Sequence, residues 1–230
     1  MDWKAAAKRA IPPALLNNLL LTFPSLYRTR LVRYETTLAS DHGIDDLVSQ
    51  LATALHLEGE IIECGSSRCG ASVIMANELR ARGVRKTIYA CDTFAGFDRL
   101  ELANERRSGL TGASDKAFTS TSLAYVQKKL RRLGVDGTIV PVQGFFRDTL
   151  PQLACPLCFA LVDCDLRESM TYCAETLWPR LVPGARMVFD DYCEPNFKGA
   201  KLAVDAFVTG HGSEIAERGL LRRLYCVRKG

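Results

Sequence analysis

The sequence predicts an α/β fold, a doubly wound and mostly parallel seven-stranded sheet with a C-terminal antiparallel hairpin and an N-terminal helical arm. From about residue 43, short apolar segments alternate with helical patterns, which is the order that parallel crossover connections produce. The last two strands follow each other around a short turn, as in a hairpin. We therefore divide the chain into an arm, residues 1–42, and one α/β domain, residues 43–230.

The composition is that of an ordinary globular protein. The 230 residues are 47% apolar and 24% charged, and a net charge of +4 with scattered basic residues gives no argument for a nucleic-acid partner. The nine cysteines form no regular framework and are expected to be reduced thiols of a cytoplasmic protein. Cys155 and Cys158 form a C-x-x-C pair, but no second pair stands at a zinc-like spacing, so a strand edge is the preferred interpretation.

The arm combines basic residues with an apolar run, Ile11–Leu21. Two prolines and two asparagines interrupt this run, no signal-peptide cleavage site follows it, and it is too short to span a bilayer. We favour an arm that packs on the domain or on a sister subunit of a homo-oligomer. The alternative is peripheral membrane contact through a basic, apolar surface. Its basic residues would be Lys4, Lys8, Arg9, Arg28, Arg30 and Arg33.

Five short apolar segments are the predicted parallel strands. They cover residues 60–64, 87–91, 139–142, 159–162 and 185–189. The closing hairpin is expected from residues 214–217 and 221–227, with Gly219 at its turn. A final hairpin on such a sheet is typical of the Rossmann-like class I methyltransferase fold.

The helices are predicted from apolar spacing and from end signals. Asp45 or Asp46 is expected to cap the first helix of the domain, which carries Leu47, Leu51 and Leu55. The next helices are expected over residues 70–82 (ended by Gly83), 116–133 (ended by Gly134), 168–181 (ended by Pro183-Gly184) and 201–208. Residues 95–114 form a polar loop that is long for an α/β connection, so we expect a lid over the site.

A glycine turn after the first strand is the candidate cofactor site. Gly65 and Gly70 let the backbone approach a ligand, and the helix starting at Gly70 directs free N–H groups toward an anion. Asp92, at the end of the second strand, is placed to accept hydrogen bonds from ribose hydroxyls. The turn is not G-x-G-x-x-G, so a dinucleotide is the weaker interpretation. After the third strand, Gln143 and one of the neighbouring phenylalanines are candidate contacts to the adenine.

Aspartates follow the fourth and fifth strands. The fourth strand ends in Val162-Asp163-Cys164-Asp165 and the fifth in Phe189-Asp190-Asp191-Tyr192. In a parallel sheet both ends lie at one edge, where several carboxylates would repel each other unless a cation neutralised them. Oxygen ligands favour Mg²⁺, or Mn²⁺ or Ca²⁺. Helix caps and turns would explain one or two of these aspartates, but not four.

The chain resembles the macrocin O-methyltransferase (TylF-type) family over about residues 59–207. The matching segments are Glu63-Cys64-Gly65 with Arg68 and Gly70, Asp92-Thr93-Phe94-Ala95-Gly96-Phe97, Gln143-Gly144-Phe145-Phe146 with Thr149-Leu150-Pro151, Asp163-Cys164-Asp165-Leu166 with Glu168-Ser169, Asp190-Asp191-Tyr192, and Gly199-Ala200-Lys201 with Ala203-Val204-Asp205. The chain departs from the family pattern at Cys69, Arg167 and Lys201 and after Gly210, which bears on the acceptor substrate more than on the reaction.

The resemblance implies an enzyme that uses S-adenosylmethionine and Mg²⁺ (or Mn²⁺). It implies metal ligands at Asp163, Asp190 and Asp191 and a general base at Asp165. The residues assigned to the cofactor are Glu63, Gly65, Ser66, Arg68, Gly70, Ser72, Asp92, Thr93, Gln143, Gly144, Phe145 and Asp163.

The expected function is metal-dependent O-methylation of a sugar hydroxyl on a glycosylated natural product or glycan. A small-molecule substrate with a sugar or diol hydroxyl is the expected partner. Catechol-type methylation is the nearest alternative, because it also uses magnesium and a vicinal diol. A nucleotide-dependent oxidoreductase lacks its glycine motif here, and a non-catalytic relative would have no use for Asp163, Asp190 and Asp191.

Overall fold

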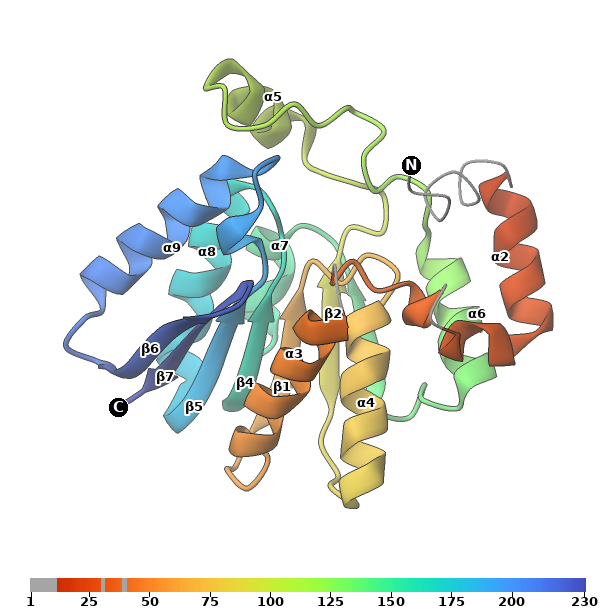
Figure 1. Ribbon diagram of the computed structural model, residues 1–230, viewed down its shortest axis with the longest axis horizontal. Helices are drawn as coiled ribbons and strands as arrows, with labels where there is room; N and C mark the ends of the chain where they lie inside the picture. Colours follow the sequence, from red (N-terminus) through yellow and green to blue (C-terminus); the bar gives the residue numbers. More distant parts are fainter. Residues whose placement is uncertain (1–11, 30–31, 39–40) are drawn as a thin grey trace.

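A mixed seven-stranded sheet forms the centre of the computed structural model, which describes residues 12–29, 32–38 and 41–230 (Figure 1). The strands lie in the order β3-β2-β1-β4-β5-β7-β6. Neighbours among the first five are parallel, whereas β7 runs antiparallel to both β5 and β6. The strand bounds are β1 (Glu60–Cys64), β2 (Ile88–Asp92), β3 (Ile139–Gln143), β4 (Leu157–Val162), β5 (Leu181–Phe189), β6 (Ile215–Leu221) and β7 (Leu224–Lys229). The predicted fold class is confirmed.

Helices cover both faces of the sheet (Figure 1). The α-helices are α2 (Pro13–Thr22), α3 (Asp41–Ala54), α4 (Gly70–Arg82), α5 (Arg99–Arg107), α6 (Leu123–Leu133), α7 (Phe146–Thr149), α8 (Arg167–Leu177) and α9 (Lys198–Gly210). Short 3₁₀ helices are η1 (Pro24–Arg28), η2 (Arg33–Glu35), η3 (Leu150–Gln152), η4 (Trp178–Arg180) and η5 (Asp191–Cys193).

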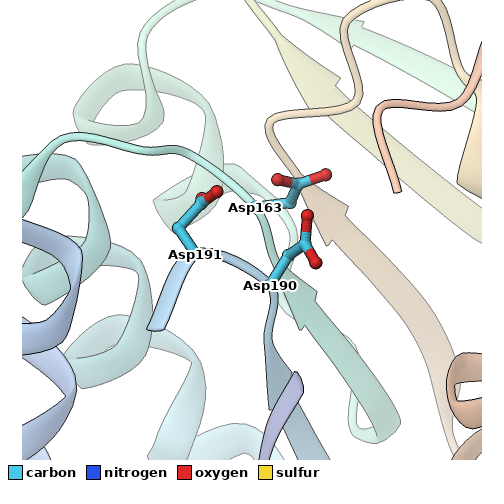
Figure 2. Close-up of side chains that lie close together, drawn as sticks. All are labelled: Asp163, Asp190 and Asp191. Carbon is cyan, nitrogen blue, oxygen red and sulfur yellow. The ribbon is translucent and has the colours of Figure 1, made fainter. Parts of the chain in front are cut away.

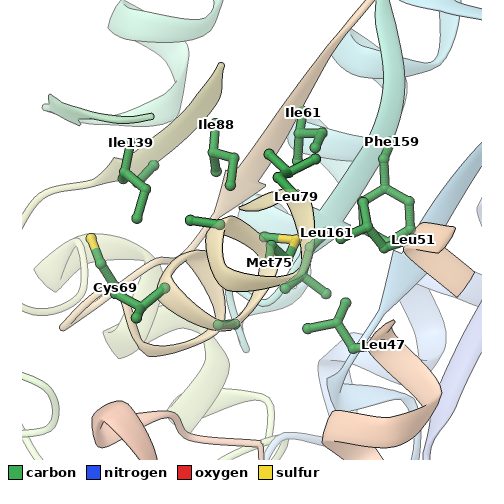
Figure 3. Close-up of a cluster of buried hydrophobic side chains, with 14 of the residues drawn as sticks. Leu47, Leu51, Ile61, Cys69, Met75, Leu79, Ile88, Ile139, Phe159 and Leu161 are labelled. Carbon is green, nitrogen blue, oxygen red and sulfur yellow. The ribbon is translucent and has the colours of Figure 1, made fainter. Parts of the chain in front are cut away.

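Two apolar cores result from the alternation of side chains along the strands. Ile61 of β1 faces one core, together with Leu47 of α3 and Met75 of α4 (Figure 3). Its neighbour Ile62 faces the other core, with Met170 of α8 and further apolar residues of α9. Because both faces are covered, all six residues of β4 are buried.

Several element ends differ from the predicted ones. Helix α3 begins at Asp41, ahead of both aspartates expected to cap it. Helix α8 ends at Leu177, and Pro183-Gly184 lies inside β5, where the register with β4 is irregular and a proline without an N–H is tolerated. The hairpin turns at residues 222–223, and Gly219 pairs with Cys226 within the hairpin.

The expected lid loop contains helix α5, which was not predicted from the sequence. Asp98 caps α5 by accepting hydrogen bonds from the backbone of Leu100 and Glu101. The helix is strongly polar, so it lacks the apolar stripe by which a surface helix is recognised. Helix α6 starts only at Leu123, where Ser122 is its cap, and not at residue 116 as predicted.

The described part of the arm packs on the domain. Leu20 and Tyr27 are fully buried, and the hydroxyl oxygens of Tyr27 and Tyr125, on α6, lie 2.9 Å apart. In contrast, Leu15 and Leu19 of α2 are exposed, as is Phe23 directly after the helix. Of the residues of the alternative membrane anchor, Lys4, Lys8, Arg9 and Arg30 lie outside the described residues. No helix in the described ranges has the length and apolar character required to cross a bilayer.

A buried lysine connects the arm to the turn between β1 and α4. The Lys129 ammonium group, fully buried on α6, donates hydrogen bonds to the backbone carbonyls of Tyr34 and Arg68, both at 2.6 Å. The carboxylate of Glu35 lies 3.1 Å from Lys129 and also accepts from the hydroxyl of Tyr125 at 2.8 Å. Arm, helix and turn therefore share one polar network.

Candidate active site

A cavity of about 550 Å³ opens at the carboxyl ends of the parallel strands, where doubly wound folds bind ligands. Residues after β1, β2, β4 and β5 line its floor, and α5 with the segment 194–197 lines its outer wall. The strand ends thus bring together residues that lie far apart in the sequence.

Asp163, Asp190 and Asp191, here called the carboxylate cluster, lie close together (Figure 2) and line this cavity. One oxygen of each carboxylate lies within 4.8 Å of those of the other two. Asp163 is 7% exposed, Asp190 1% and Asp191 3%. Burial, followed by repulsion from Asp190, raises the pKa of Asp191 to about 7, and burial with the neighbouring aspartates raises that of Asp163 well above its usual range.

Each member of the carboxylate cluster has a different neighbour. The hydroxyl of Thr37, from the arm, donates to Asp163 at 3.3 Å, and the backbone N–H of Asp165 donates to Asp191 at 3.0 Å. Oδ1 of Asp190 is buried without a hydrogen-bond partner among the described residues, although Nε of Arg223 lies 3.4 Å from it. The donor set is oxygen-only and preassembled, which fits a hard divalent cation.

Asp165 lines the cavity, and its backbone is not extended. Its φ of 62° lies in the left-handed region, and the bend brings its N–H to Asp191. Asp165 does not cap α8, because Leu166 occupies the cap position and no side chain caps this helix. Burial and the nearby Asp191 raise the pKa of the Asp165 carboxyl well above its usual range.

The turn after β1 is held tightly against β4. Gly65 has a φ of 91°, and a Cβ atom there would lie 1.7 Å from the carbonyl oxygen of Asp163, so only glycine fits. Glu63 and Ser72 are buried and hydrogen-bonded to each other, and burial raises the pKa of Glu63 to about 7. Ser66 is buried, and its hydroxyl has no partner in the described part of the chain.

Asp92, at the end of β2, binds the backbone of the turn after β1. One carboxylate oxygen accepts from the backbone of Ser67 at 2.8 Å and the other from that of Phe94 at 2.6 Å. Each oxygen keeps capacity for a further donor, such as a ribose hydroxyl. Thr93 and Phe145 line the cavity next to Asp92. Gln143 donates to the carbonyl of Thr93 at 3.3 Å, and the N–H of Gly144 donates to that of Asp92 at 3.0 Å.

Arg68 and Gly70 face the arm and do not line the cavity. The guanidinium of Arg68 contacts Glu35 and donates to Asn17 at 2.9 Å. A Cβ atom on Gly70 would lie 2.3 Å from the backbone of Thr36, so this glycine allows the arm to pack closely on the turn. This contact could not be predicted from the sequence, because the arm and the turn meet only in the folded chain.

Two buried carboxylates of α5 were not predicted from the sequence, and one of them, Glu101, lines the cavity. Glu101 accepts from the backbone N–H and the hydroxyl of Ser169, at 2.6 and 2.7 Å, and Glu105 accepts from the N–H of Arg167 at 2.9 Å. These N–H groups belong to the first turn of α8, which has no cap of its own. The only sequence signal for this role is the spacing of Glu101 and Glu105, which are four residues apart. Acidic residues at this spacing on a helix more often face solvent.

Aromatic side chains form the outer wall of the cavity. Phe97 contacts Phe118 and Phe197 edge to face, with ring centroids 5.2 and 5.8 Å apart. A backbone bridge from Thr111 to Phe197 fixes the end of the α5 segment to the chain after β5. The cavity therefore has an acidic floor and a partly apolar wall.

Comparisons with known proteins identify the family of this chain. The model of a family described as Macrocin-O-methyltransferase (TylF) matches residues 36–216. Mycinamicin III 3''-O-methyltransferase from Micromonospora griseorubida is 30% identical over 167 residues, which are 69% of this chain and 65% of that protein. An O-methyltransferase of Streptomyces olivaceus, named for the 4' position of a rhamnosyl-tetracenomycin, is 32% identical over 58% of this chain and 53% of its own. The chain thus spans between half and two thirds of the length of these curated relatives.

Solved structures show the same fold. The structure of the O-methyltransferase NovP has a TM-score of 0.71 and 21% identity, and the comparison covers 95% of this chain and 99% of that one. For CalS11, a calicheamicin methyltransferase, the TM-score is 0.65 at 22% identity, with coverage of 95% and 91%.

Proposed function

From the chain's membership of the macrocin O-methyltransferase (TylF) family, we propose that it transfers a methyl group from S-adenosylmethionine to a sugar hydroxyl of a glycosylated natural product, with a divalent cation. The observation that carries the proposal is the carboxylate cluster beside Gly65 and Asp92 in one cavity. The Streptomyces olivaceus relative supports the sugar acceptor, since its name specifies a rhamnosyl group.

The residues of the cavity divide into three groups by role. Gly65, Ser67 and Asp92 would hold the methyl donor, and the carboxylate cluster would hold the cation. When bound, the donor supplies a methyl group on a positively charged sulfur, and the cation lowers the pKa of a hydroxyl that it contacts. Asp165 accepts the proton that this hydroxyl loses as its oxygen gains the methyl group, and S-adenosylhomocysteine leaves with the methylated sugar.

The charge of the cavity favours a neutral or cationic acceptor. The described residues lining it include nine acidic side chains and two arginines, Arg147 and Arg223. Arg99, Arg106 and Arg107 of α5 do not line the cavity. Arg106, for example, pairs with Asp115 at 2.7 Å. The aromatic wall around Phe97 suits the apolar face of a sugar or its aglycone.

The donor can be tested by calorimetry with S-adenosylhomocysteine and with NAD. We expect only S-adenosylhomocysteine to bind. Asp92→Ala should weaken its binding by about 1.5–3 kcal/mol, because charged hydrogen bonds to the ribose are lost. Asp136→Ala, an exposed aspartate before β3, is the control and should leave the affinity unchanged. Binding of NAD alone would refute the proposed donor.

A divalent cation should be required for activity. Exhaustive chelation should abolish methyl transfer and added Mg²⁺ should restore it, whereas full activity after chelation would contradict the proposal. Asp190→Asn and Asp191→Asn should each raise the metal concentration needed, because each removes a charged ligand. Asp205→Asn, which changes an exposed aspartate paired with Lys201 on α9, should not.

The pH dependence of stability gives a second readout of this requirement. The pKa of Asp191 in the folded protein is raised to about 7, above the ~3.9 of an unfolded aspartate, so the metal-free protein should lose stability as pH rises from about 4 through 7. A bound cation compensates the ionised carboxylates. The melting-temperature increase produced by Mg²⁺ should therefore grow between about pH 5 and 8.

A further inference from the structure

Arg223 enters the cavity from the turn between β6 and β7. This turn lies beyond residues 36–216, the part of the chain that the family model matches. The guanidinium places Nε 3.4 Å from Oδ1 of Asp190 and Nη2 3.1 Å from Oε2 of Glu194. Its side chain is 26% exposed, against 2% for that of Asp190, so the contact lies largely out of water.

The contact between Arg223 and Asp190 is an ion pair without a hydrogen bond. Nε of Arg223 and Oδ1 of Asp190 are both buried, and neither has a hydrogen-bond partner among the described residues. The arginine therefore contributes charge to Asp190 but does not use the lone pairs of this oxygen. That oxygen keeps its capacity to bind a further positive ligand.

Arg147, the second arginine of the cavity, serves a different part of it. It pairs with Asp98 at 2.9 Å and lies over the ring of Phe145, with its guanidinium carbon 4.7 Å from the ring centroid. Of the cations among the described residues that line the cavity, Arg223 is thus the one that faces the carboxylate cluster.

We propose that Arg223 is a built-in counter-ion of the carboxylate cluster, which stabilises the cluster when no metal is bound and weakens its affinity for a divalent cation. This inference rests on the proposed function, because it takes the cluster to be the metal site. A fixed positive charge beside Asp190 lowers the negative potential that attracts a cation. The same charge offsets the repulsion among the three carboxylates before a cation arrives.

Manganese titration followed by electron paramagnetic resonance tests the inference without any activity measurement. Arg223→Met removes the charge and keeps apolar bulk, and it should tighten Mn²⁺ binding about tenfold, which corresponds to ~1.4 kcal/mol. The metal-free variant should melt at a lower temperature than the metal-free wild type. Its melting temperature should also rise further on adding Mn²⁺. Arg223→Lys retains the charge and should bind Mn²⁺ nearly as the wild type does.

Arg222 is the matched control in the same turn. It pairs with Asp46 of α3, with Nε 2.9 Å from Oδ2, and it does not line the cavity. Arg222→Met should lower stability by loss of this pair, but it should leave the affinity for Mn²⁺ unchanged. This control distinguishes an effect on Mn²⁺ affinity that comes from misfolding of the turn from one that comes from the charge of Arg223.

The outcomes separate this inference from the proposed function. Unchanged or weaker Mn²⁺ binding in Arg223→Met, with a wild type that binds Mn²⁺, overturns the role of Arg223 and leaves the metal site standing. If neither protein binds Mn²⁺, both the metal requirement and the inference fail. If only the variant binds within the range tested, the arginine competes with the cation as proposed.

Discussion

Replacing Asp165 by asparagine should reduce turnover by roughly 10²–10⁴-fold, with little change in stability or metal affinity. The side chain lines the cavity beside the carboxylate cluster, where an acceptor hydroxyl would lose its proton. Asparagine is nearly isosteric and tolerates the left-handed φ of 62° at this position, so the bend and the N–H bond to Asp191 should persist. The substitution removes only the carboxylate oxygen that would accept the proton.

Turnover, melting temperature and Mn²⁺ affinity should be measured together for Asp165→Asn. A helix-capping role would predict near-normal turnover, but the cap position of α8 is Leu166, without a side-chain cap. Wild-type turnover in the variant would rule out Asp165 as the base. A large loss of Mn²⁺ affinity would instead identify Asp165 as a metal ligand.

Replacing Lys129 by methionine should lower the free energy of unfolding by about 3 kcal/mol, because it removes the fully buried member of an ion pair. The carbonyls of Tyr34 and Arg68 would each lose a donor at 2.6 Å, and Glu35 would lose a cation at 3.1 Å. The expected loss of stability is at the lower end of the range for breaking a buried ion pair, since Arg68 still contacts Glu35 in the variant.

Urea denaturation measures this effect, and Lys128→Met is the control. Lys128 precedes Lys129 on α6 but is exposed, so its replacement should change stability by no more than about 0.5 kcal/mol. Equal free energies of unfolding for the two variants would show that the contacts of Lys129 contribute no more to stability than those of the exposed Lys128.

The sequence predicts the central fold well because its signals are local. Helix α4 has the predicted bounds, since Gly83 adopts the left-handed conformation that ends it. The hairpin turn was misplaced because it contains no glycine. Arg222, with a φ of 47°, is held there by Asp46 on α3, a contact that no local pattern encodes.

The same distinction applies to the candidate site. The carboxylate cluster was predictable, because strand ends in a parallel sheet must meet at one edge. Contacts between distant segments were not predictable. Arg68 was assigned to the cofactor but faces Glu35 of the arm, and Glu101 was not identified, although it accepts the N–H of Ser169 in the first turn of α8.

The docking of α5 on α8 limits how acceptor choice can be re-engineered in this scaffold. Grafting the segment 93–122 from a relative would separate Glu101 and Glu105 from the N–H groups of Ser169 and Arg167, which they satisfy. Those amides would then lie at a helix end without acceptors, directly after Asp165. A chimera should therefore exchange α5 and the first turn of α8 as one piece, so that donor and acceptor groups come from the same parent.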